Sequence, residues 1–324
     1  MAERAGVSIA TVSRVVRDSG TVRPETRERV SRAISELHYT PNQLGRRLAE
    51  QTHAANGIVF PDLSGPYYAE VVLGYEDVAA DLGRSVLILS THGRDAAPAM
   101  VEDMAGRCDG LVILGRTVAD DVVERLARRN TPLVLLARAP IEGVDTVKAE
   151  NTSAAVRLGQ HVIGNGARRI AFVGDPEDSA DVSERWVGLQ RAVGASEDVV
   201  LTLARSGDLG EDAGAAVARQ FLASGELPDA FVCANDELAL GLMGGLREAG
   251  IDVPGQVMVT GWDDVMAARY AGLTTVRQPM RELGATAARL LDELITGSRT
   301  EPRHEVLPTE LVVRTSSTRP RKES

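Results

Sequence analysis

The chain has 324 residues, of which 44% are hydrophobic and 25% charged, as is typical of a folded globular protein. No apolar run reaches the roughly 18 residues that a membrane helix needs, and residues 1–14 lack the apolar segment of a secretory signal. These features exclude a membrane segment and predict a cytoplasmic protein.

The net charge of −10 is unevenly distributed along the chain. Residues 1–56 carry nine arginines and six acidic residues, whereas the remainder carries 27 basic and 40 acidic residues. The first part therefore has a charge of +3 (9 − 6) and the second −13 (27 − 40). A basic head on an acidic body is expected when a small DNA-binding unit is joined to a larger domain.

The amino-terminal residues predict three short helices. The first covers Ala2–Ala5 and ends at the turn of Gly6, and Ser8 can cap the second, Ile9–Arg17, by accepting a hydrogen bond from its first turn. After the loop Asp18–Arg23 the third covers Glu25–Leu37. The third helix has Val30, Ala33, Ile34 and Leu37 on one face. Three short helices with glycine at the first turn indicate a helix-turn-helix head over residues 1–40.

Residues 41–56 predict a short helical segment and a linker, and from Gly57 onward strands and helices alternate. The helical stretches include 68–82, 118–129, 151–165, 211–224, 235–249 and 280–296. This alternation predicts an α/β fold with mostly parallel sheets, and its length predicts two doubly wound lobes over residues 57–318, followed by a flexible tail at 319–324. The strand candidates are 57–60, 85–90, 110–115, 132–137, 169–173, 198–203, 229–233, 256–260 and 273–276.

The two cysteines predict no redox or metal chemistry. Cys108 and Cys233 each adjoin an apolar run, which is typical of buried, reduced thiols. No CxxC pair exists and the five histidines form no cluster, so we expect no metal and no cofactor. The chain also lacks a G-x-S-x-G motif and a P-loop, and we expect that it is not an enzyme.

In the segment AGVSIATVSRVV, the polar residues Thr11, Ser13 and Arg14 lie on the exposed parts of the predicted second helix. Val12 and Val15 can face the core of the head. Arginine can read a guanine edge through two hydrogen bonds, and hydroxyl groups suit phosphate oxygens. From spacing alone, an ordinary amphipathic surface helix explains the pattern equally well.

Residues 1–48 resemble the head of the LacI/GalR family through AGVS-x-x-TVSRVV, V-x-x-x-TR-x-x-V and L-x-Y-x-PN. The resemblance implies that Ile9–Arg17 is the recognition helix, with Ile9 and Ala10 at the positions that vary with operator sequence and Arg14 as the base-reading arginine. It also implies that the segment after Pro41 folds as a hinge helix on the operator, with Leu48 inserted between base pairs. The remaining positions that it implies in DNA contact are Ser8, Thr11, Ser13, Arg17, Thr21, Thr26 and Asn42.

Family members carry several residues before the first match, and here Met1 stands where they have a valine. The remaining turn is short for a stable first helix. We therefore expect that translation starts upstream, and N-terminal sequencing of the native protein tests this. The alternative is a shortened head that binds DNA weakly or not at all, which would leave a ligand-binding protein.

Polar and aromatic residues follow several predicted strands in the body. Asp62, Asn235 and Asp263 each come after such a strand, where ligands bind in doubly wound lobes. Tyr67 and Tyr68 offer flat faces that can stack on a sugar or a base. These residue types together predict a cleft for a hydroxyl-rich ligand.

Gly57–Thr315 resembles the effector domain of the same family, a fold shared with periplasmic sugar-binding proteins, through RRIAFVGDP, SERWVGL and LTTVRQPMRELG. Ala137 and Leu209 stand where many members have a carboxylate and an aromatic residue, so the effector's identity stays open. Asp236 and Asp264 are expected to cap helices, and Trp186 and Trp262 either line the cleft or pack beneath it. The resemblance implies effector contacts at Tyr67, Tyr68, Arg185, Asn235 and Asp263.

The resemblance as a whole implies a sequence-specific transcription regulator, expected to be a repressor. We expect a homodimer that binds a double-stranded DNA operator, with its affinity modulated by a small molecule, a sugar or related metabolite, held between the lobes.

Overall fold

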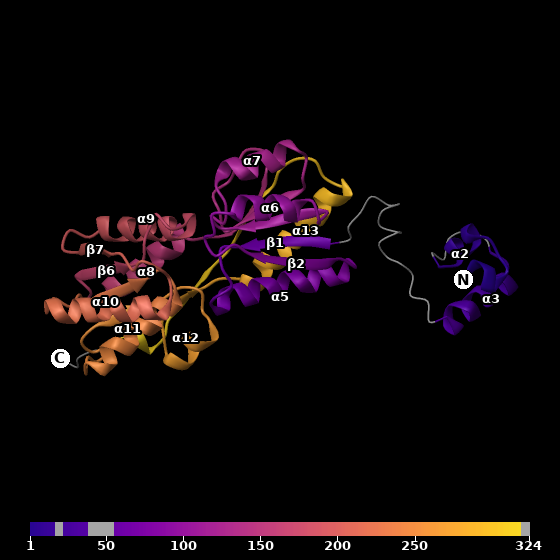
Figure 1. Cartoon of the computed structure of the whole chain (residues 1–324). Coiled ribbons are helices and arrows are strands. Elements are labelled where there is room, and N and C mark those ends of the chain that lie inside the picture. The colour runs from indigo at the N-terminus through magenta and orange to yellow at the C-terminus, as the bar shows by residue number, and fades with distance from the viewer. Residues whose placement is uncertain (17–21, 38–54, 319–324) are drawn as a thin grey trace. The chain divides into compact units, whose positions relative to one another are not determined.

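The computed structural model describes residues 1–16, 22–37 and 55–318, and the chain divides into two compact units, Met1–His53 and Ala54–Ser324. The first unit contains three helices, α1 (Ala2–Ala5), α2 (Ile9–Val16) and α3 (Pro24–Glu36). The second unit contains all of the strands and the other helices of the described residues (Figure 1).

The three helices of the first unit match the predicted head. Its small core consists of Ala5, Val12, Val15, Val30 and Ala33. The predicted cap of α2 is confirmed, because the Thr11 amide donates to Ser8 Oγ at 3.2 Å. The prediction for Leu37 is wrong: it follows the last turn of α3 and is 48% exposed.

The first lobe of the second unit is built on a six-stranded sheet in the order β11-β5-β4-β3-β1-β2, and all of its neighbouring strands are parallel. Alternate side chains of these strands pack on opposite faces, against α5 and α13 on one side and α6 and α7 on the other (Figure 1). Its elements are β1 (Ala55–Phe60), α5 (Pro66–Asp81), β2 (Ser85–Ser90), α6 (Ala97–Ala105), β3 (Gly110–Leu114), α7 (Asp120–Arg128), β4 (Leu133–Leu136), β5 (Asp145–Ala149), α13 (Met280–Thr296) and β11 (His304–Leu307).

The second lobe is built on a four-stranded parallel sheet in the order β7-β6-β8-β9, with a small antiparallel pair of β10 and β12 beside it. The helices pack as two pairs, α8 with α9 and α10 with α11. Its elements are α8 (Thr152–Gly164), β6 (Arg169–Val173), α9 (Ala180–Gly194), β7 (Val200–Ala204), α10 (Glu211–Ser224), β8 (Ala230–Cys233), α11 (Asp236–Glu248), β9 (Met258–Thr260), α12 (Met266–Ala271), β10 (Thr275–Arg277), β12 (Glu310–Val312) and the 3-10 turn η1 (Thr315–Ser317).

The two lobes confirm the predicted α/β fold, and Cys108 and Cys233 are buried free thiols. The predicted boundary between the linker and the lobes, at residue 57, is wrong by two residues. The strand β1 begins at Ala55, so Ala55 and Asn56 belong to the sheet and not to the linker. The strands β5, β11 and β12 lie outside the predicted strands, whereas the helices α6, α9 and α12 lie between predicted strands, where helices were expected without stated bounds. The strand β11, for example, is short and alternates exposed with half-buried residues, and it becomes a strand only by pairing with β5, at the register His304 to Thr146.

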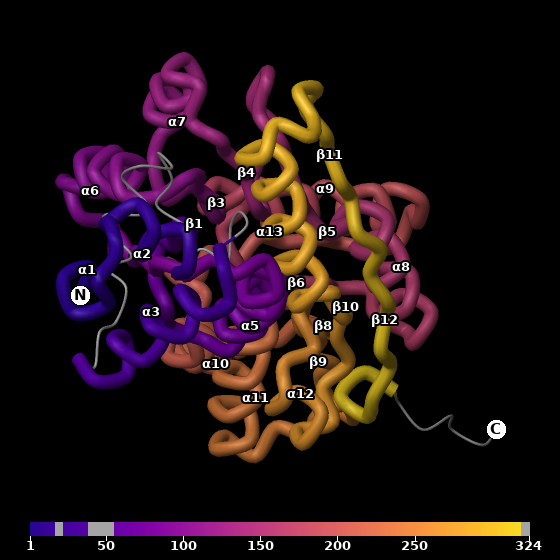
Figure 2. The backbone as a smooth tube through the Cα atoms, turned by 90° about the vertical axis from the view of Figure 1, so that its right-hand side faces the viewer, coloured from indigo at the N-terminus to yellow at the C-terminus, as the bar shows by residue number. Residues whose placement is uncertain are grey.

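The chain passes between the lobes three times, in the segments 150–151, 278–279 and 308–309 that separate elements of one lobe from elements of the other. Figure 2 shows the last of these as the yellow stretch between β11 and β12. Three crossovers leave the lobes able to reorient only about these short segments.

Glycine pairs let the helices of each lobe approach closely. On α5, a Cβ atom at Gly74 would overlap the carbonyl oxygen of Arg281 on α13, and Gly284 on α13 has the same relation to Val71. Gly214 and Gly241 form the equivalent pair between α10 and α11. The absence of a side chain at these positions sets the distance between the helices that carry the cleft residues.

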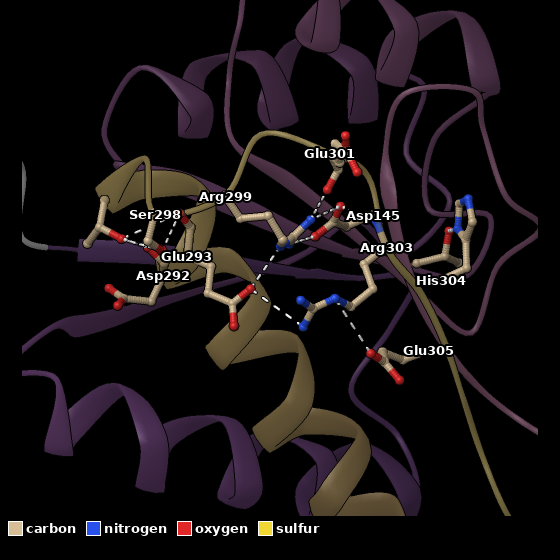
Figure 3. Close-up of polar contacts among 11 residues, drawn as sticks. Asp145, Asp292, Glu293, Ser298, Arg299, Glu301, Arg303, His304 and Glu305 are labelled. Carbon is tan, nitrogen blue, oxygen red and sulfur yellow. Dashed lines mark hydrogen bonds and ion pairs between the residues drawn. The ribbon is translucent and has the colours of Figure 1, made fainter.

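A network of charged side chains fastens the loop after α13 to β5 (Figure 3). Arg299 donates to both carboxylate oxygens of Asp145, which is 1% exposed, and its Nε donates to Glu293 at 2.8 Å. The Arg303 amide also donates to Asp145 at 2.9 Å. These contacts hold β11 against β5 and thereby position the third crossover.

Candidate functional site

The first candidate site is the exposed face of α2 in the helical unit. Ile9 is 80% exposed, Ala10 and Arg14 are also exposed, and Val12 and Val15 on the opposite face are buried against α1 and α3. Two contacts brace the helices: an ion pair between Arg4 and Glu36 at 2.7 Å, and a hydrogen bond from the Arg29 guanidinium to the Gly6 carbonyl at 3.1 Å.

The sequence-predicted DNA contacts divide into two groups. Ser8, Ile9, Ala10, Thr11, Ser13 and Arg14 lie together at the start and along the outer side of α2, with Ser8 and Thr11 joined by a 2.9 Å hydrogen bond between their hydroxyls. Thr26 lies half-buried in the first turn of α3. The other predicted contacts, Arg17, Thr21, Asn42 and Leu48, lie outside the described residues.

The second candidate site is a cavity of about 630 Å³ between the lobes of the larger unit. Its walls are formed by segments that directly follow strands of both sheets, at their carboxyl ends, as expected for doubly wound lobes. All six predicted effector residues line it. They are Asp62, Tyr67 and Tyr68 from the first lobe and Arg185, Asn235 and Asp263 from the second.

Arg185 on α9 is the central cation of the cavity. Its Nη1 donates to the Ala234 carbonyl at 2.7 Å and its Nε donates to Asn151 Oδ1 at 2.9 Å, while its guanidinium carbon lies 4.6 Å above the Trp262 ring. These contacts hold a nearly fully buried guanidinium in one orientation, with Asp181 Oδ2 3.9 Å from Nη2. A fixed fork of donors can bind two oxygens of a ligand at once.

Asp263 follows β9 on strained backbone, with φ of 113°, and the next residue, Asp264, has φ of 60°. Burial raises the pKa of the Asp263 carboxyl to about 7, although Arg185 and a hydrogen bond from Gln278 oppose the shift. Strain and a costly buried carboxyl at one residue are typical of functional sites.

Tyr67 and Tyr68 begin α5 and meet edge to face, with ring centroids 5.5 Å apart. Tyr68 also packs edge-on against Phe60, at 5.6 Å, so it both lines the cavity and packs on the lobe. The Tyr67 hydroxyl is buried without a hydrogen-bond partner, and burial raises the pKa of this group well above its usual value. The group is thus a neutral, buried hydroxyl without a hydrogen-bond partner on a residue that lines the cavity.

Asn235 is the N-cap of α11, because its Oδ1 accepts a hydrogen bond from the Leu238 amide at 3.0 Å, while its Nδ2 donates to the Leu209 carbonyl. The prediction that Asp236 caps this helix is therefore wrong. Asp236 accepts instead from the Thr275 hydroxyl and the Val265 amide, and burial raises the pKa of its carboxyl. Its role is structural, because these two hydrogen bonds connect α11 to β10 and to the start of α12.

Asp264 does not cap a helix either, since its carboxylate pairs with Arg277 at 2.7 Å and with Arg314 at 2.6 Å. The two tryptophans pack beneath the cleft. Trp262 lies under the Arg185 guanidinium and is fully buried, and Trp186 packs against Phe172 with ring centroids 5.5 Å apart.

The cavity is acidic overall. Burial raises the pKa of Glu237, on α11, and the neighbouring Asp62 raises it further. A Cβ atom at Gly65 would lie 2.7 Å from the Glu237 carboxylate, so this side chain reaches the opposite lobe. Six carboxyl groups therefore surround two arginines, which disfavours an anionic ligand. The carboxyl groups are Asp62, Asp178, Asp181, Asp208, Glu237 and Asp263, and the arginines are Arg116 and Arg185.

Ala137 and Leu209 both line the cavity, so the two departures noted in the sequence lie where they can change ligand choice. Sequence reasoning missed Glu237, Asp181 and Gln278. Gln278 lies two residues after the predicted strand 273–276. The rule that polar residues just after a strand line the cleft, which found Asp62 and Asp263, could therefore have found Gln278 as well. Asp181 and Glu237 lie within helices, where no pattern distinguishes them from solvated charges.

No group of three or more histidine, cysteine or acidic residues within 1–16, 22–37 and 55–318 is arranged to hold a metal ion. None of the helices in these same ranges combines the length and apolarity needed to cross a bilayer.

Each of the two units matches a known protein family. Residues 1–42 match the family described as bacterial regulatory proteins, lacI family, and residues 160–317 match a periplasmic binding protein-like domain. The chain is 34% identical to the HTH-type transcriptional regulator CelR of Thermobifida fusca, over 98% of this chain and 96% of that protein.

Two solved structures are similar over almost the whole chain. A transcriptional regulator CelR–cellobiose complex has 32% identity and a TM-score of 0.74, with 97% of this chain and 98% of that one covered. A lac repressor dimer bound to operator and the anti-inducer ONPF has 29% identity and a TM-score of 0.88, with 98% of both chains covered.

Proposed function

The chain belongs to the LacI family of bacterial regulatory proteins, and from this premise we propose that it is a repressor whose operator affinity is set by a sugar bound between its lobes. The observation that carries the proposal is the combination in one chain of a helix-turn-helix unit, with a polar recognition face, and a cavity into which both lobes direct polar groups. We propose further that the protein acts by binding and not by catalysis, and that it works in the cytoplasm, where its proposed DNA target lies.

We assign base reading to the outer face of α2. Arg14 is exposed there and has the two parallel donors that match a guanine edge, while Ile9 and Ala10 offer apolar contact of the kind that suits a thymine methyl group. Ser8, Thr11, Ser13 and Thr26 have hydroxyls for phosphate oxygens. For Arg17, Thr21, Asn42 and Leu48 the assignment to DNA contact rests on the family motif alone.

The effector that the cavity favours is an uncharged, hydroxyl-rich molecule. Carboxylates such as Asp263 accept hydrogen bonds from sugar hydroxyls, Arg185 can donate to ring or hydroxyl oxygens, and the faces of Tyr67 and Tyr68 supply an apolar platform. The excess of carboxyl groups disfavours phosphorylated and carboxylated sugars. The relative CelR has been solved with cellobiose, which makes cellobiose the first sugar to test.

We propose a homodimer, the state in which the similar lac repressor was solved. Each lobe has an exposed apolar patch that a second copy would cover. In the first lobe Ile88 (48% exposed) lies on the edge strand β2, on the face of the sheet that α5 covers, and Leu73 on α5 is also exposed. Leu87 is exposed on the opposite face of β2. In the second, Met266 and Tyr270 (82% exposed) lie on α12. Exposed edge strands and grouped large apolar side chains favour association.

A dimer gives the lobes control over DNA binding. Two recognition helices fit two half-sites only at a matching separation. A sugar that binds one lobe arrangement more tightly shifts the population toward it, and the three crossovers convert that shift into a new spacing of the chain segments that lead to the helical units.

A mobility-shift assay tests the proposal directly. Full-length protein is titrated with the DNA upstream of its own gene and with scrambled DNA, at 150 mM salt, with and without neutral mono- and disaccharides that include cellobiose and ribose. We expect preference for the native DNA, and a change in its affinity by a factor of at least five with one sugar.

The two halves of the proposal fail separately. Equal affinity for native and scrambled DNA in every ligand state, with a sugar still bound, would leave a ligand-binding protein without operator function. Operator preference that no small molecule alters would leave a DNA-binding protein without an effector.

A further inference from the structure

The 3-10 turn η1, near the carboxyl end of the described residues, is fastened to the second lobe by buried hydroxyl groups. Ser316 Oγ accepts a hydrogen bond from the Thr274 amide at 2.8 Å, and Ser316 is 2% exposed. The Ser316 amide donates to the carbonyl of Gly272, the C-cap of α12, at 2.9 Å. The turn therefore holds the end of α12 in place, and α12 carries the exposed apolar patch of this lobe.

A chain of hydrogen bonds with one possible direction leads from this turn to α8. Thr274 Oγ1 donates to the Arg314 carbonyl at 2.9 Å, because a carbonyl can only accept. Thr274 Oγ1 therefore accepts from Ser317 Oγ at 2.7 Å, which uses the single proton of the Ser317 hydroxyl. Ser317 Oγ also lies 2.7 Å from His161 Nε2, so His161 is the donor in this contact. The chain thus requires a proton on Nε2 of His161.

The other ring nitrogen of His161 faces a second donor. Asn165 Nδ2 donates to the His161 carbonyl at 2.8 Å, which orients the amide, and it lies 3.5 Å from His161 Nδ1. Nδ1 is therefore an acceptor, in agreement with a proton on Nε2. Protonation of Nδ1 would set two N–H donors against each other at a half-buried position, where a charged ring is also poorly solvated.

The charged groups around His161 do not favour its charged form. Burial lowers the pKa of the His161 imidazole below its usual value, and no charged side chain of the described residues adds to or opposes this shift. Several of the charged groups on the neighbouring elements are engaged elsewhere, the first two in hydrogen bonds to carbonyls and the last two in ion pairs. These groups are Arg157 on α8, Arg168 just after α8, Arg191 on α9, Glu310 on β12 and Arg314 before η1, of which Arg191 is exposed.

We infer that His161 is an acid-sensitive anchor of the turn η1 and, through that turn, of the end of α12. With a neutral ring the chain of hydrogen bonds is complete, and with a charged ring the contact at Asn165 becomes repulsive. Neither effector nor operator binding is involved, so the anchor is independent of the proposed function.

The sign of the pH dependence follows from the lowered pKa of His161 in the folded protein. When the turn opens, the ring returns to its usual pKa of about 6.5 and takes up a proton more readily than in the closed state. The anchor is therefore fully formed well above pH 6.5 and weakens as the pH falls below it. At pH 5.5 this linkage can raise the opened population by at most about 10-fold.

Hydrogen exchange of the full chain at pH 5.5 and 7.5, corrected for the intrinsic exchange rates, measures the opening. The reporters are the peptides that contain Ser316, Thr274 and the end of α12. For the wild type we expect about a 3- to 10-fold loss of protection in all three at pH 5.5. His161→Gln, whose amide can still donate to Ser317 but does not titrate, should lose less than about 2-fold.

Two further variants act as controls. His304→Gln is the matched one, because His304 is an exposed histidine of the first lobe whose Nδ1 also contacts a hydroxyl, Thr146 Oγ1, at 2.9 Å. It should keep the wild-type pH dependence of all three peptides. Ser317→Ala cuts the chain of hydrogen bonds, so it should lower protection at both pH values and reduce the difference between them.

Equal protection of the wild type at the two pH values would overturn the inference, as would a His161→Gln variant that keeps the wild-type pH dependence. Loss of protection at the turn without any at the end of α12 would overturn the part that concerns α12. Nitrogen NMR of histidine-labelled wild-type protein tests the same anchor if His161→Gln does not fold. A proton on Nε2 and a titration midpoint below pH 6.5 are expected, and a proton on Nδ1 or a midpoint at or above pH 6.5 would overturn the inference.

Discussion

The buried carboxyl group of Asp263 makes a prediction in which stability and binding change in opposite directions. Asparagine at this position has the same shape, tolerates the positive φ of 113°, and can still accept the hydrogen bond from Gln278. Asp263→Asn therefore removes the negative charge and little else. We expect the variant to be more stable than the wild type at pH 8 and to bind the effector more weakly.

The magnitude follows from the pKa of this group. In the folded protein the pKa is about 7, against 3.8 for the free side chain. Because the folded-state pKa is raised, the carboxyl group favours the folded state fully only below pH 3.8, and this contribution is lost as the pH rises toward 7. At pH 8 the difference of 3.2 units corresponds to about 4 kcal/mol, of which about 3 kcal/mol develops between pH 5 and pH 8.

The assay is urea denaturation of both proteins at pH 5, 6, 7 and 8, followed by circular dichroism. The other buried carboxyl groups are present in both proteins, so the difference between the two curves reports mainly Asp263. The difference should grow with pH up to about pH 7 and then level off. Isothermal titration with the effector at pH 8 should show a Kd at least 10-fold higher for the variant, through loss of a charged hydrogen-bond acceptor.

Asp264→Asn is the matched control, because it removes the neighbouring carboxylate, which pairs with Arg277 and Arg314. It should lower the free energy of unfolding at pH 8 by about 2 kcal/mol, the opposite sign. If the difference in free energy of unfolding between wild type and Asp263→Asn stays constant from pH 5 to pH 8, the argument is refuted that burial of this charge lowers the stability of the folded protein.

Four further changes test other parts of the structure. Arg14→Ala should lower operator affinity by about 1–3 kcal/mol and relax the base preference at one position of each half-site, and a selection from randomised operators that returns the wild-type motif would contradict this. Ile88→Glu on the edge strand β2 should convert the proposed dimer to a monomer in sedimentation velocity, whereas an unchanged sedimentation coefficient would exclude this surface. Gly241→Ala places a methyl group on a carbonyl oxygen of α10 and should lower the free energy of unfolding, measured by urea denaturation, by about 3 kcal/mol. Gly244→Ala lies one turn further along α11 in open space and should raise the free energy of unfolding by about 0.5–1 kcal/mol. Similar changes for the two variants would contradict the packing argument. Asp145→Asn weakens the contacts that hold the loop after α13 and should lower the urea midpoint by the equivalent of about 3 kcal/mol, an expectation that an unchanged midpoint would refute.

The sequence by itself predicted the elements whose signal is local. The three short helices of the head, the cap at Ser8, and the long helices and central strands of both lobes follow from the spacing of apolar residues and from turn and cap residues. It also predicted that Asp62, Asn235 and Asp263 would share one site, because ligands of doubly wound lobes bind at the carboxyl ends of the strands, between the two lobes, and all three residues line the cavity.

The tertiary structure alone decided what depends on pairing between distant segments. The edge strand β11 exists through its partner β5, about 160 residues earlier in the chain. Asn235 rather than Asp236 caps α11, because Asp236 is engaged by Thr275 from another element. Likewise the hydrogen bond from Gln278 to Asp263 forms only because the second crossover passes beside the residues that follow β9. Local pattern reports which face of an element is buried, but the partner of a polar side chain is set by the assembled lobes, since hydrogen bonds act only at contact distance.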